Sequence, residues 1–262
     1  MDLGIKGKTA LVLGGNRGIG RGIAQALADE GVNVAITGRD KPVGAAAAAE
    51  IAAKSKTRAA FFELDLSRTA SLKAAADHIG SEFGPIDILV NNSGGPEYGG
   101  ALNRDPKEWS DSFQDMVVSV IALTDAIIPG MRQRKWGRVM SVISSGVLQP
   151  IPVLAISNSL RAAVVGWSKT LSSEVAGDGV TVNILVPGRI ATERVRLTDA
   201  AVAERQKISV EEVESRSFAT IPIGRYGTVE EFGAMAAFIA SKQASYVTGA
   251  MLRVDGGIVR SW

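Results

Sequence analysis

The chain has 262 residues, of which 46% are hydrophobic and 21% charged, and its formal net charge is +2. This balance is typical of a globular protein with a sizeable core, and it gives no broad positive field for nucleic acid. The chain contains no cysteine, which excludes disulfides, thiolate zinc ligands and cysteine nucleophiles, and its single histidine cannot form a metal site alone. We therefore expect no metal and no nucleic-acid partner, and the cysteine count fits a cytoplasmic location.

Short apolar runs of strand length alternate with amphipathic or alanine-rich stretches along most of the chain. This alternation predicts one α/β domain over residues 1–262, a doubly wound, Rossmann-like parallel sheet of about seven strands with helices on both faces. The predicted strands are Thr9–Leu13, Asn33–Thr37, Ala59–Leu64, Ile86–Asn91, Gly137–Ile143, Val180–Val186 and Met251–Val254, and the predicted helices are Gly20–Glu30, Val43–Ala53, Ser71–Phe83, Pro106–Arg132, Ser157–Ala176 and Val229–Ile239.

One long segment, Ile190 to Ile221, contains no predicted strand; it is charged and helical in pattern. It follows the carboxyl end of a predicted strand, where open α/β sheets bind ligands, so a lid over a substrate is favoured over a solvated excursion. The longest apolar runs, such as Val117 to Leu123, are too short to span a bilayer, so no membrane partner is expected. His78 is expected on the solvated face of a helix.

A glycine cluster follows the first predicted strand and opens the first predicted helix. Gly14 can adopt the conformation of a tight turn, Gly18 lets the backbone approach a pyrophosphate, and Gly20 allows close packing of helix on strand. The helix N-terminus adds N–H donors and a positive dipole. The loop therefore predicts a dinucleotide site.

The end of the second predicted strand indicates which dinucleotide is bound. An NAD site usually has an acidic residue there to grip the ribose, but the sequence is Thr37-Gly38-Arg39-Asp40. Arg39 can pair with a 2′-phosphate, with Arg17 of the glycine loop beside it, while Asp40 is expected to point to solvent. NADP(H) is therefore favoured, with NAD(H) as the alternative.

These motifs together resemble the short-chain dehydrogenase/reductase family, and β-ketoacyl-acyl-carrier-protein reductases are the nearest broad relatives. The likeness covers nearly the whole chain, through the glycine loop, Asn91-Asn92-Ser93-Gly94, Pro187-Gly188, Tyr246-Val247-Thr248-Gly249 and Val254-Asp255-Gly256-Gly257. The cofactor-binding residues that the resemblance implies, together with those of the loop itself, are Gly14, Asn16, Arg17, Gly18, Ile19, Gly20, Arg39, Asp65, Leu66, Asn92, Ser93, Gly94, Arg161, Pro187, Gly188, Ile190 and Thr192.

The family's catalytic positions are altered in this sequence. The resemblance implies Ser144 as the catalytic serine, with Ser145 as the adjacent alternative, but the tyrosine position holds Ser157 and the lysine position Arg161. The asparagine position holds Met116. An aliphatic hydroxyl is a far weaker acid than a phenol, and arginine stays protonated, although its charge can stabilise a developing anion.

Two other residues are candidates to compensate for the missing phenol. Asn158 lies beside the vacant tyrosine position, and Tyr98 lies just beyond the Asn91–Gly95 segment. Tyr98 either reaches the nicotinamide pocket or packs on the lid, which is the favoured reading. Tyr226 is expected at the surface.

Three functions follow as hypotheses. The leading one is an NADP(H)-dependent oxidoreductase acting on a carbonyl or alcohol of a small-molecule substrate, with Ser144, Ser157 and Arg161 at the reaction centre. The alternatives are an inactive NADP(H)-binding sensor and a non-redox lyase of the halohydrin-dehalogenase type, which also carries arginine at the lysine position. The resemblance further implies a homotetramer.

Overall fold

The computed structural model of the chain describes residues 1–261. Within them, seven parallel strands form one sheet in the order β3-β2-β1-β4-β5-β6-β7. All seven predicted strands are confirmed, and their ends differ from the prediction by two residues at most. The strands are β1 (Thr9–Val12), β2 (Asn33–Gly38), β3 (Ala59–Glu63), β4 (Ile88–Asn91), β5 (Gly137–Val142), β6 (Val180–Pro187) and β7 (Met251–Val254).

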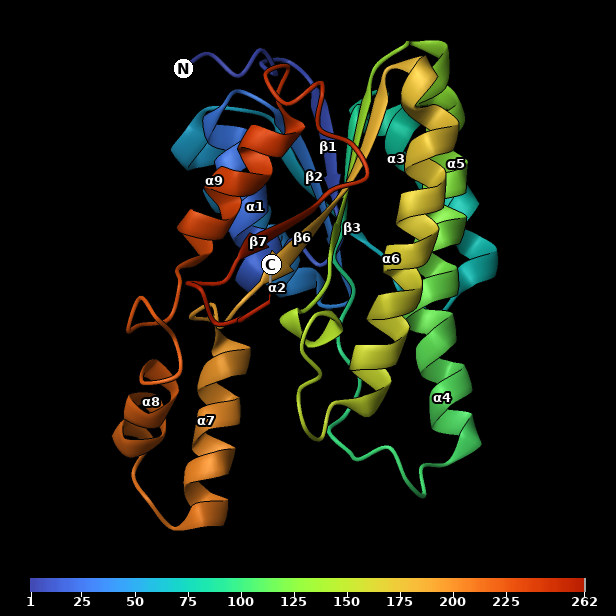
Figure 1. Cartoon of the computed structure of the whole chain (residues 1–262). Helices are drawn as coiled ribbons and strands as arrows, with labels where there is room; N and C mark the ends of the chain where they lie inside the picture. The colour runs from blue at the N-terminus through green and yellow to red at the C-terminus, as the bar shows by residue number, and fades with distance from the viewer. Residues whose placement is uncertain (262) are drawn as a thin grey trace.

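Helices cover both faces of the sheet, as predicted (Figure 1). One face carries α1 (Gly18–Asp29), α2 (Lys41–Ser55) and α9 (Val229–Ala240), and the other carries α3 (Leu72–Phe83), α5 (Ser119–Gln133) and α6 (Ala155–Val175). Successive residues of a strand point to opposite faces, so Val12 packs in the first layer and Leu11 in the second. Burial on both faces explains why the strands read as continuous apolar runs.

The predicted helix Pro106–Arg132 is continuous but not uniform. It consists of α4 (Pro106–Phe113), one π-helical segment (Gln114–Val118) and α5. By length and composition, Pro106–Gln133 passes as a possible membrane span, which the separate apolar runs did not indicate. In this fold Leu123, Ile127 and Met131 are buried against the sheet and α3. Its apolar face is therefore part of the core.

The order of the strands positions the site. β1 pairs with β2 on one side and with β4 on the other. The strands β1 to β3 are therefore added toward one edge of the sheet and β4 to β7 toward the other, so the strand order reverses between β1 and β4. Ligands of open α/β sheets bind outside the carboxyl ends of the strands at this point. In Figure 1, α7 (Glu193–Gln206) and α8 (Val210–Phe218) extend beyond this edge on one side, and α4 and the start of α6 lie on the other.

The predicted lid is helical and is anchored by a buried carboxylate. Asp199 of α7 is 1% exposed, forms an ion pair with Arg189, and accepts a hydrogen bond from the Tyr226 hydroxyl at 2.9 Å. Tyr226 also stacks edge-on against Phe218 of α8. The expectation that Tyr226 lies at the surface was therefore wrong: its ring is partly buried because it joins both lid helices to the segment before α9.

Candidate active site

The glycine loop has the geometry that a phosphate cradle requires. Gly14 and Gly18 have positive φ values of 58° and 55°, which side-chain-bearing residues rarely adopt. A Cβ on Gly20 would lie 2.3 Å from the Gly14 carbonyl oxygen, so only glycine fits there. Asn92 fixes the loop from β4, because its Nδ2 donates to the Leu13 carbonyl at 3.1 Å.

The start of α1 faces this loop with its N–H groups uncapped. Arg17, at the N-cap position, makes no side-chain capping bond, and the first turn holds no acidic residue. On the opposite side, a Cβ on Gly18 would come within 3.7 Å of the Thr192 side chain, which caps α7. The loop and the start of α7 therefore lie side by side at the uncapped N-terminus of α1, and a dinucleotide pyrophosphate fits this arrangement.

The residues predicted to bind the adenosine end of the cofactor follow β2 and β3. Asn16 covers Gly38, where a Cβ would lie 3.0 Å from the amide carbon. The pKa of Asp65 lies below its ordinary value, mainly because Ser67 donates backbone and side-chain hydrogen bonds, with a further contribution from Arg39. Burial and the charge of Asp65 raise the pKa of Asp115. Arg39, Asp65 and Asp115 therefore lie near one another, and Asp115 is a residue that no sequence motif indicated.

Asp40 does not simply point to solvent, as the sequence suggested. It caps α2 by accepting from the Val43 N–H at 3.1 Å, and it lies 3.6 Å from the guanidinium of Arg17. Both side chains are about half exposed, at 59% and 44%, so this pair is weakly held in water. Arg17 is thus available to a stronger anion beside Arg39.

Arg161 joins the carboxyl ends of β4 and β5 from its place on α6. Its Nη1 donates to the Val142 carbonyl at 3.0 Å, and its Nη2 donates to the carbonyls of Ser93 and Gly94 at 3.4 and 3.2 Å. Its Nε donates to the Ser157 hydroxyl at 3.3 Å. Burial, together with the charge of Arg194, lowers the pKa of Arg161 to about 10.

The predicted serines lie at the same edge of the sheet. The Ser144 hydroxyl follows β5 and accepts from the Gly146 N–H at 3.1 Å, and Ser145 begins the short 3-10 turn that follows. Ser157 is buried beneath Arg161. Asn158 instead holds the loop before α6, because its Nδ2 donates to the Ile151 carbonyl at 3.0 Å. Asn158 therefore positions the backbone of the loop before α6.

Met116 and Tyr98 do not supply the missing phenol or amide. Met116 is buried in the π-helical segment and has no hydrogen-bond donor. The Tyr98 hydroxyl lies 2.8 Å from the Thr198 hydroxyl on α7, and the side chain is half exposed. Tyr98 thus contacts the lid, in agreement with the favoured interpretation.

The remaining predicted cofactor residues lie around the same edge. Pro187 ends β6, Gly188 packs against Asp255, where a Cβ would lie 2.6 Å from its Cα, and Ile190 is buried. The lid also brings in Arg194, which the motifs did not indicate. Its guanidinium lies over Gly95, where a Cβ would be 2.8 Å from Nη2.

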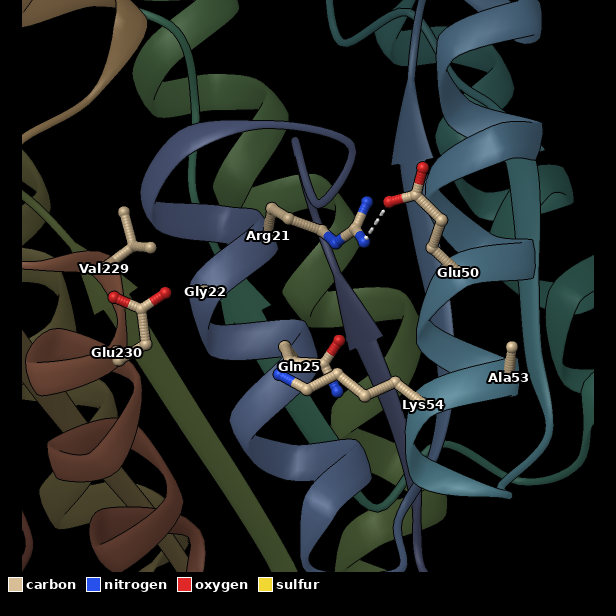
Figure 2. A pocket seen from close by; sticks show the side chains of 8 residues that line it. All are labelled: Arg21, Gly22, Gln25, Glu50, Ala53, Lys54, Val229 and Glu230. Atoms are coloured by element: carbon tan, nitrogen blue, oxygen red, sulfur yellow. Dashed lines mark hydrogen bonds and ion pairs between the residues drawn. The ribbon is translucent and has the colours of Figure 1, made fainter.

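A separate pocket lies on the outer side of α1, between α2 and the start of α9 (Figure 2). Arg21 of α1 forms an ion pair of 2.9 Å with Glu50 of α2 across it. None of the predicted site residues lines this pocket, which is formed by Arg21, Gly22, Gln25, Glu50, Ala53, Lys54, Val229 and Glu230. It plays no part in the arrangement described above.

Comparison with known proteins identifies the family. A family model described as enoyl-(acyl carrier protein) reductase matches residues 14–259. The chain is 33% identical over 252 residues to a 3-oxoacyl-(acyl-carrier-protein) reductase of Chlamydia muridarum, covering 96% of this chain and 97% of the relative. It is 35% identical over 257 residues to the D-beta-hydroxybutyrate dehydrogenase of Cupriavidus necator, covering 97% and 99%.

A solved structure extends the likeness to the whole fold. The L-sorbose reductase of Gluconobacter frateurii, complexed with NADPH and L-sorbose, superposes with a TM-score of 0.95 at 29% identity and full coverage of both chains. Its fold matches the seven-stranded sheet described here. The chain therefore belongs to the short-chain dehydrogenase/reductase family of oxidoreductases.

Proposed function

We propose that the protein is an NADP(H)-dependent oxidoreductase that interconverts a carbonyl group and an alcohol on a small molecule. The observation that carries this proposal is the meeting of the glycine loop with Ser144, Ser157 and Arg161 at the carboxyl edge of the sheet. The names of the relatives refer to oxo or hydroxy compounds, and the L-sorbose reductase structure contains NADPH. These names support the reaction class and the cofactor.

The residues present fit a phosphorylated nicotinamide dinucleotide. The loop from Gly14 to Gly20 and the N-terminus of α1 would hold the pyrophosphate, while Arg39 and Arg17 would hold the 2′-phosphate. Pro187, Gly188 and Thr192 would lie against the nicotinamide, as the family resemblance implies. When bound, the nicotinamide exchanges a hydride with the substrate carbon.

The chain's own groups would bind and polarise the substrate oxygen. Ser157 accepts a hydrogen bond from Arg161, so its hydroxyl hydrogen is directed toward a further acceptor. Ser144 offers a second hydroxyl, and the guanidinium charge would stabilise the negative charge that develops on the oxygen. Neither serine is acidic enough to give up a proton readily, so we assign the proton to solvent water.

The direct experiment is a turnover assay with NADPH and a panel of aldehydes, ketones and oxo esters. Oxidation of NADPH with formation of the alcohol is expected for at least one class. Tight binding of NADPH without turnover on the whole panel would contradict the proposal.

A sensor without catalysis is the second candidate. It is favoured by one observation: within residues 1–261 no tyrosine hydroxyl bonds to Ser157 or Arg161. It predicts cofactor binding, no turnover, and a response of residues 190–221 to the cofactor. The lyase alternative rests on Arg161 alone, and the glycine loop, which carries no side chain at residues 14, 15, 18 and 20, argues against it. Halide release from a vicinal haloalcohol without nucleotide would support it.

We also propose a homotetramer in the cytoplasm. The family resemblance implies that the predicted helices Pro106–Arg132 and Ser157–Ala176 form one interface of the tetramer. Phe113 on α4, within the first of them, is 44% exposed, which leaves an apolar side chain for a neighbouring subunit. Sedimentation equilibrium tests this assembly.

A further inference from the structure

Two arginines approach the predicted reaction centre from different elements. Arg161 comes from α6 and Arg194 from the first turn of the lid helix α7. They lie close enough for the charge of Arg194 to disfavour the charge of Arg161. The Arg194 guanidinium lies over Gly95, directly beyond the Gly94 carbonyl that binds Arg161.

The position of Arg194 depends on a glycine. A Cβ on Gly95 would lie 2.8 Å from Nη2, 3.0 Å from Nη1 and 3.1 Å from Cζ of Arg194. Any side chain at residue 95 would therefore push the guanidinium away from the loop. The Gly95–Arg194 contact thus places a second cation at the edge of the site.

Neither arginine has an acidic partner within residues 1–261. Arg161 donates to three backbone carbonyls and one hydroxyl, and the Arg194 side chain makes no hydrogen bond or ion pair in that part of the chain. Arg189, which precedes the 190–221 segment, is by contrast paired with the buried Asp199 of α7. The segment therefore leaves Arg194 without a counter-charge.

Arg161 is partly buried and Arg194 is exposed next to it. Two neighbouring like charges repel each other, and a bound anion offsets that repulsion. A guanidinium presents its donors in a planar fork that matches the two oxygens of a carboxylate. The Ser157 hydroxyl accepts from Arg161, the Ser144 hydroxyl follows β5 at the same edge of the sheet, and both remain for an adjacent carbonyl oxygen.

We propose that the substrate is an oxo acid, or the matching hydroxy acid, whose carboxylate is bound by Arg194 with the charge of Arg161 behind it. This inference rests on the proposed function for its carbonyl chemistry. The competing ligand for Arg194 is the pyrophosphate of the cofactor. We favour the substrate because Thr192 already faces the phosphate loop at Gly18, whereas Arg194 lies over Gly95.

The test compares oxo acids with their own methyl esters. NADPH-dependent reduction of 2-oxobutanoate and 3-oxobutanoate is measured against methyl 2-oxobutanoate and methyl 3-oxobutanoate, in the wild type and in Arg194→Ala, Arg194→Lys and Arg196→Ala. Arg196→Ala is the matched control because Arg196 is exposed on the same helix and forms no ion pair in residues 1–261. The wild type should favour the acids by about tenfold or more in kcat/KM, the usual effect of a charge-assisted pair.

Arg194→Ala should abolish this preference by raising KM for the acids only, Arg194→Lys should retain part of it, and Arg196→Ala should leave it unchanged. Equal reduction of acids and esters by the wild type would overturn the inference while leaving the proposed function standing. Weaker NADPH binding in Arg194→Ala, measured by fluorescence titration, with an unchanged acid preference would assign the arginine to the cofactor and overturn the inference.

A binding measurement separates the two proposals. Calorimetric titration of the NADP-saturated protein with oxamate, which carries a carboxylate next to a carbonyl, should show binding that Arg194→Ala loses. Such binding without turnover of any carbonyl would support the anion site and contradict the proposed function. Absence of oxamate binding together with absence of acid preference would contradict the anion site.

Discussion

Arg161 donates its Nε hydrogen bond to the Ser157 hydroxyl at 3.3 Å, one helical turn away on α6. The family resemblance implies that this pair stands where relatives have lysine and tyrosine, so the spacing would be kept while the side-chain chemistry differs. A hydroxyl that receives a bond from a cation is a good donor but a poor acid. The site is therefore built to stabilise charge on a substrate oxygen, and this assignment leads to the following predictions.

Ser144→Ala should lower kcat by about tenfold to a thousandfold with little change in the Kd for NADPH, because one donor to the developing charge is lost. The measurement is steady-state kinetics on the best substrate of the panel. Ser145→Ala is the control, since Ser145 begins the next turn. Ser144 also caps that turn through Gly146, so thermal unfolding should show that both variants are folded at the assay temperature. Equal kcat in Ser144→Ala and the wild type would contradict the assignment.

The pH dependence of kcat should lack a titration near neutrality. Burial lowers the pKa of Arg161 to about 10, and the group remains a cation below that value. Because the protonated form is the active one, kcat for reduction should stay level from about pH 6 to about pH 9 and fall at higher pH. A pKa near neutrality in the kcat profile would show that another group supplies the proton.

Cofactor preference should depend on Arg39 and on the charge of Asp40. Arg39→Ala should weaken the binding of NADPH by about tenfold or more, and the binding of NADH much less, because a charge-assisted phosphate contact is lost. Asp40→Asn should bind NADPH more tightly than the wild type, since Arg17 loses its partner at 3.6 Å while asparagine still caps α2. Fluorescence titration with both nucleotides measures these constants. An Arg39→Ala variant with the wild-type ratio of the two constants would refute the phosphate assignment.

The buried Asp199 should stabilise the lid. Asp199→Asn leaves the Arg189 guanidinium without its carboxylate, which costs about 3 kcal/mol for a buried pair and somewhat less here because Arg189 is partly exposed. The loss of stability should appear as a lower unfolding temperature and as faster limited proteolysis within residues 190–221. Glu193→Gln, exposed in the first turn of the same helix, should change both much less, because it removes only a solvent-exposed interaction with the helix dipole. A lid that resists protease equally in Asp199→Asn and the wild type would contradict this role.

The fold could be predicted because its signals are local. The inner strands are short buried runs such as Thr9–Val12, and the glycines at 14, 18 and 20 are required by backbone conformation and close packing within one strand–helix turn. The positions of Ser144, Ser157 and Arg161 could likewise be counted from the preceding strand.

Contacts between distant segments could not be predicted in the same way. Asp40 reads as a solvent-facing acid, yet it caps α2 and meets Arg17 across the turn. The burial of Tyr226 depends on Asp199, 27 residues earlier in the chain. The guanidinium of Arg194 lies over Gly95, and no motif or spacing in the sequence indicates that these two residues are in contact. Such pairs are set by how the lid packs over the edge of the sheet.

The most direct test of the central claim is hydride transfer itself. The protein is incubated with NADPH that carries deuterium at both hydrogen positions of nicotinamide C4, together with the carbonyl panel, and each alcohol product is analysed by mass spectrometry. We predict that deuterium appears on the carbinol carbon of at least one product and that transfer is slowed in Ser144→Ala. NADPH binding without deuterium in any product would contradict the assignment of the protein as an oxidoreductase.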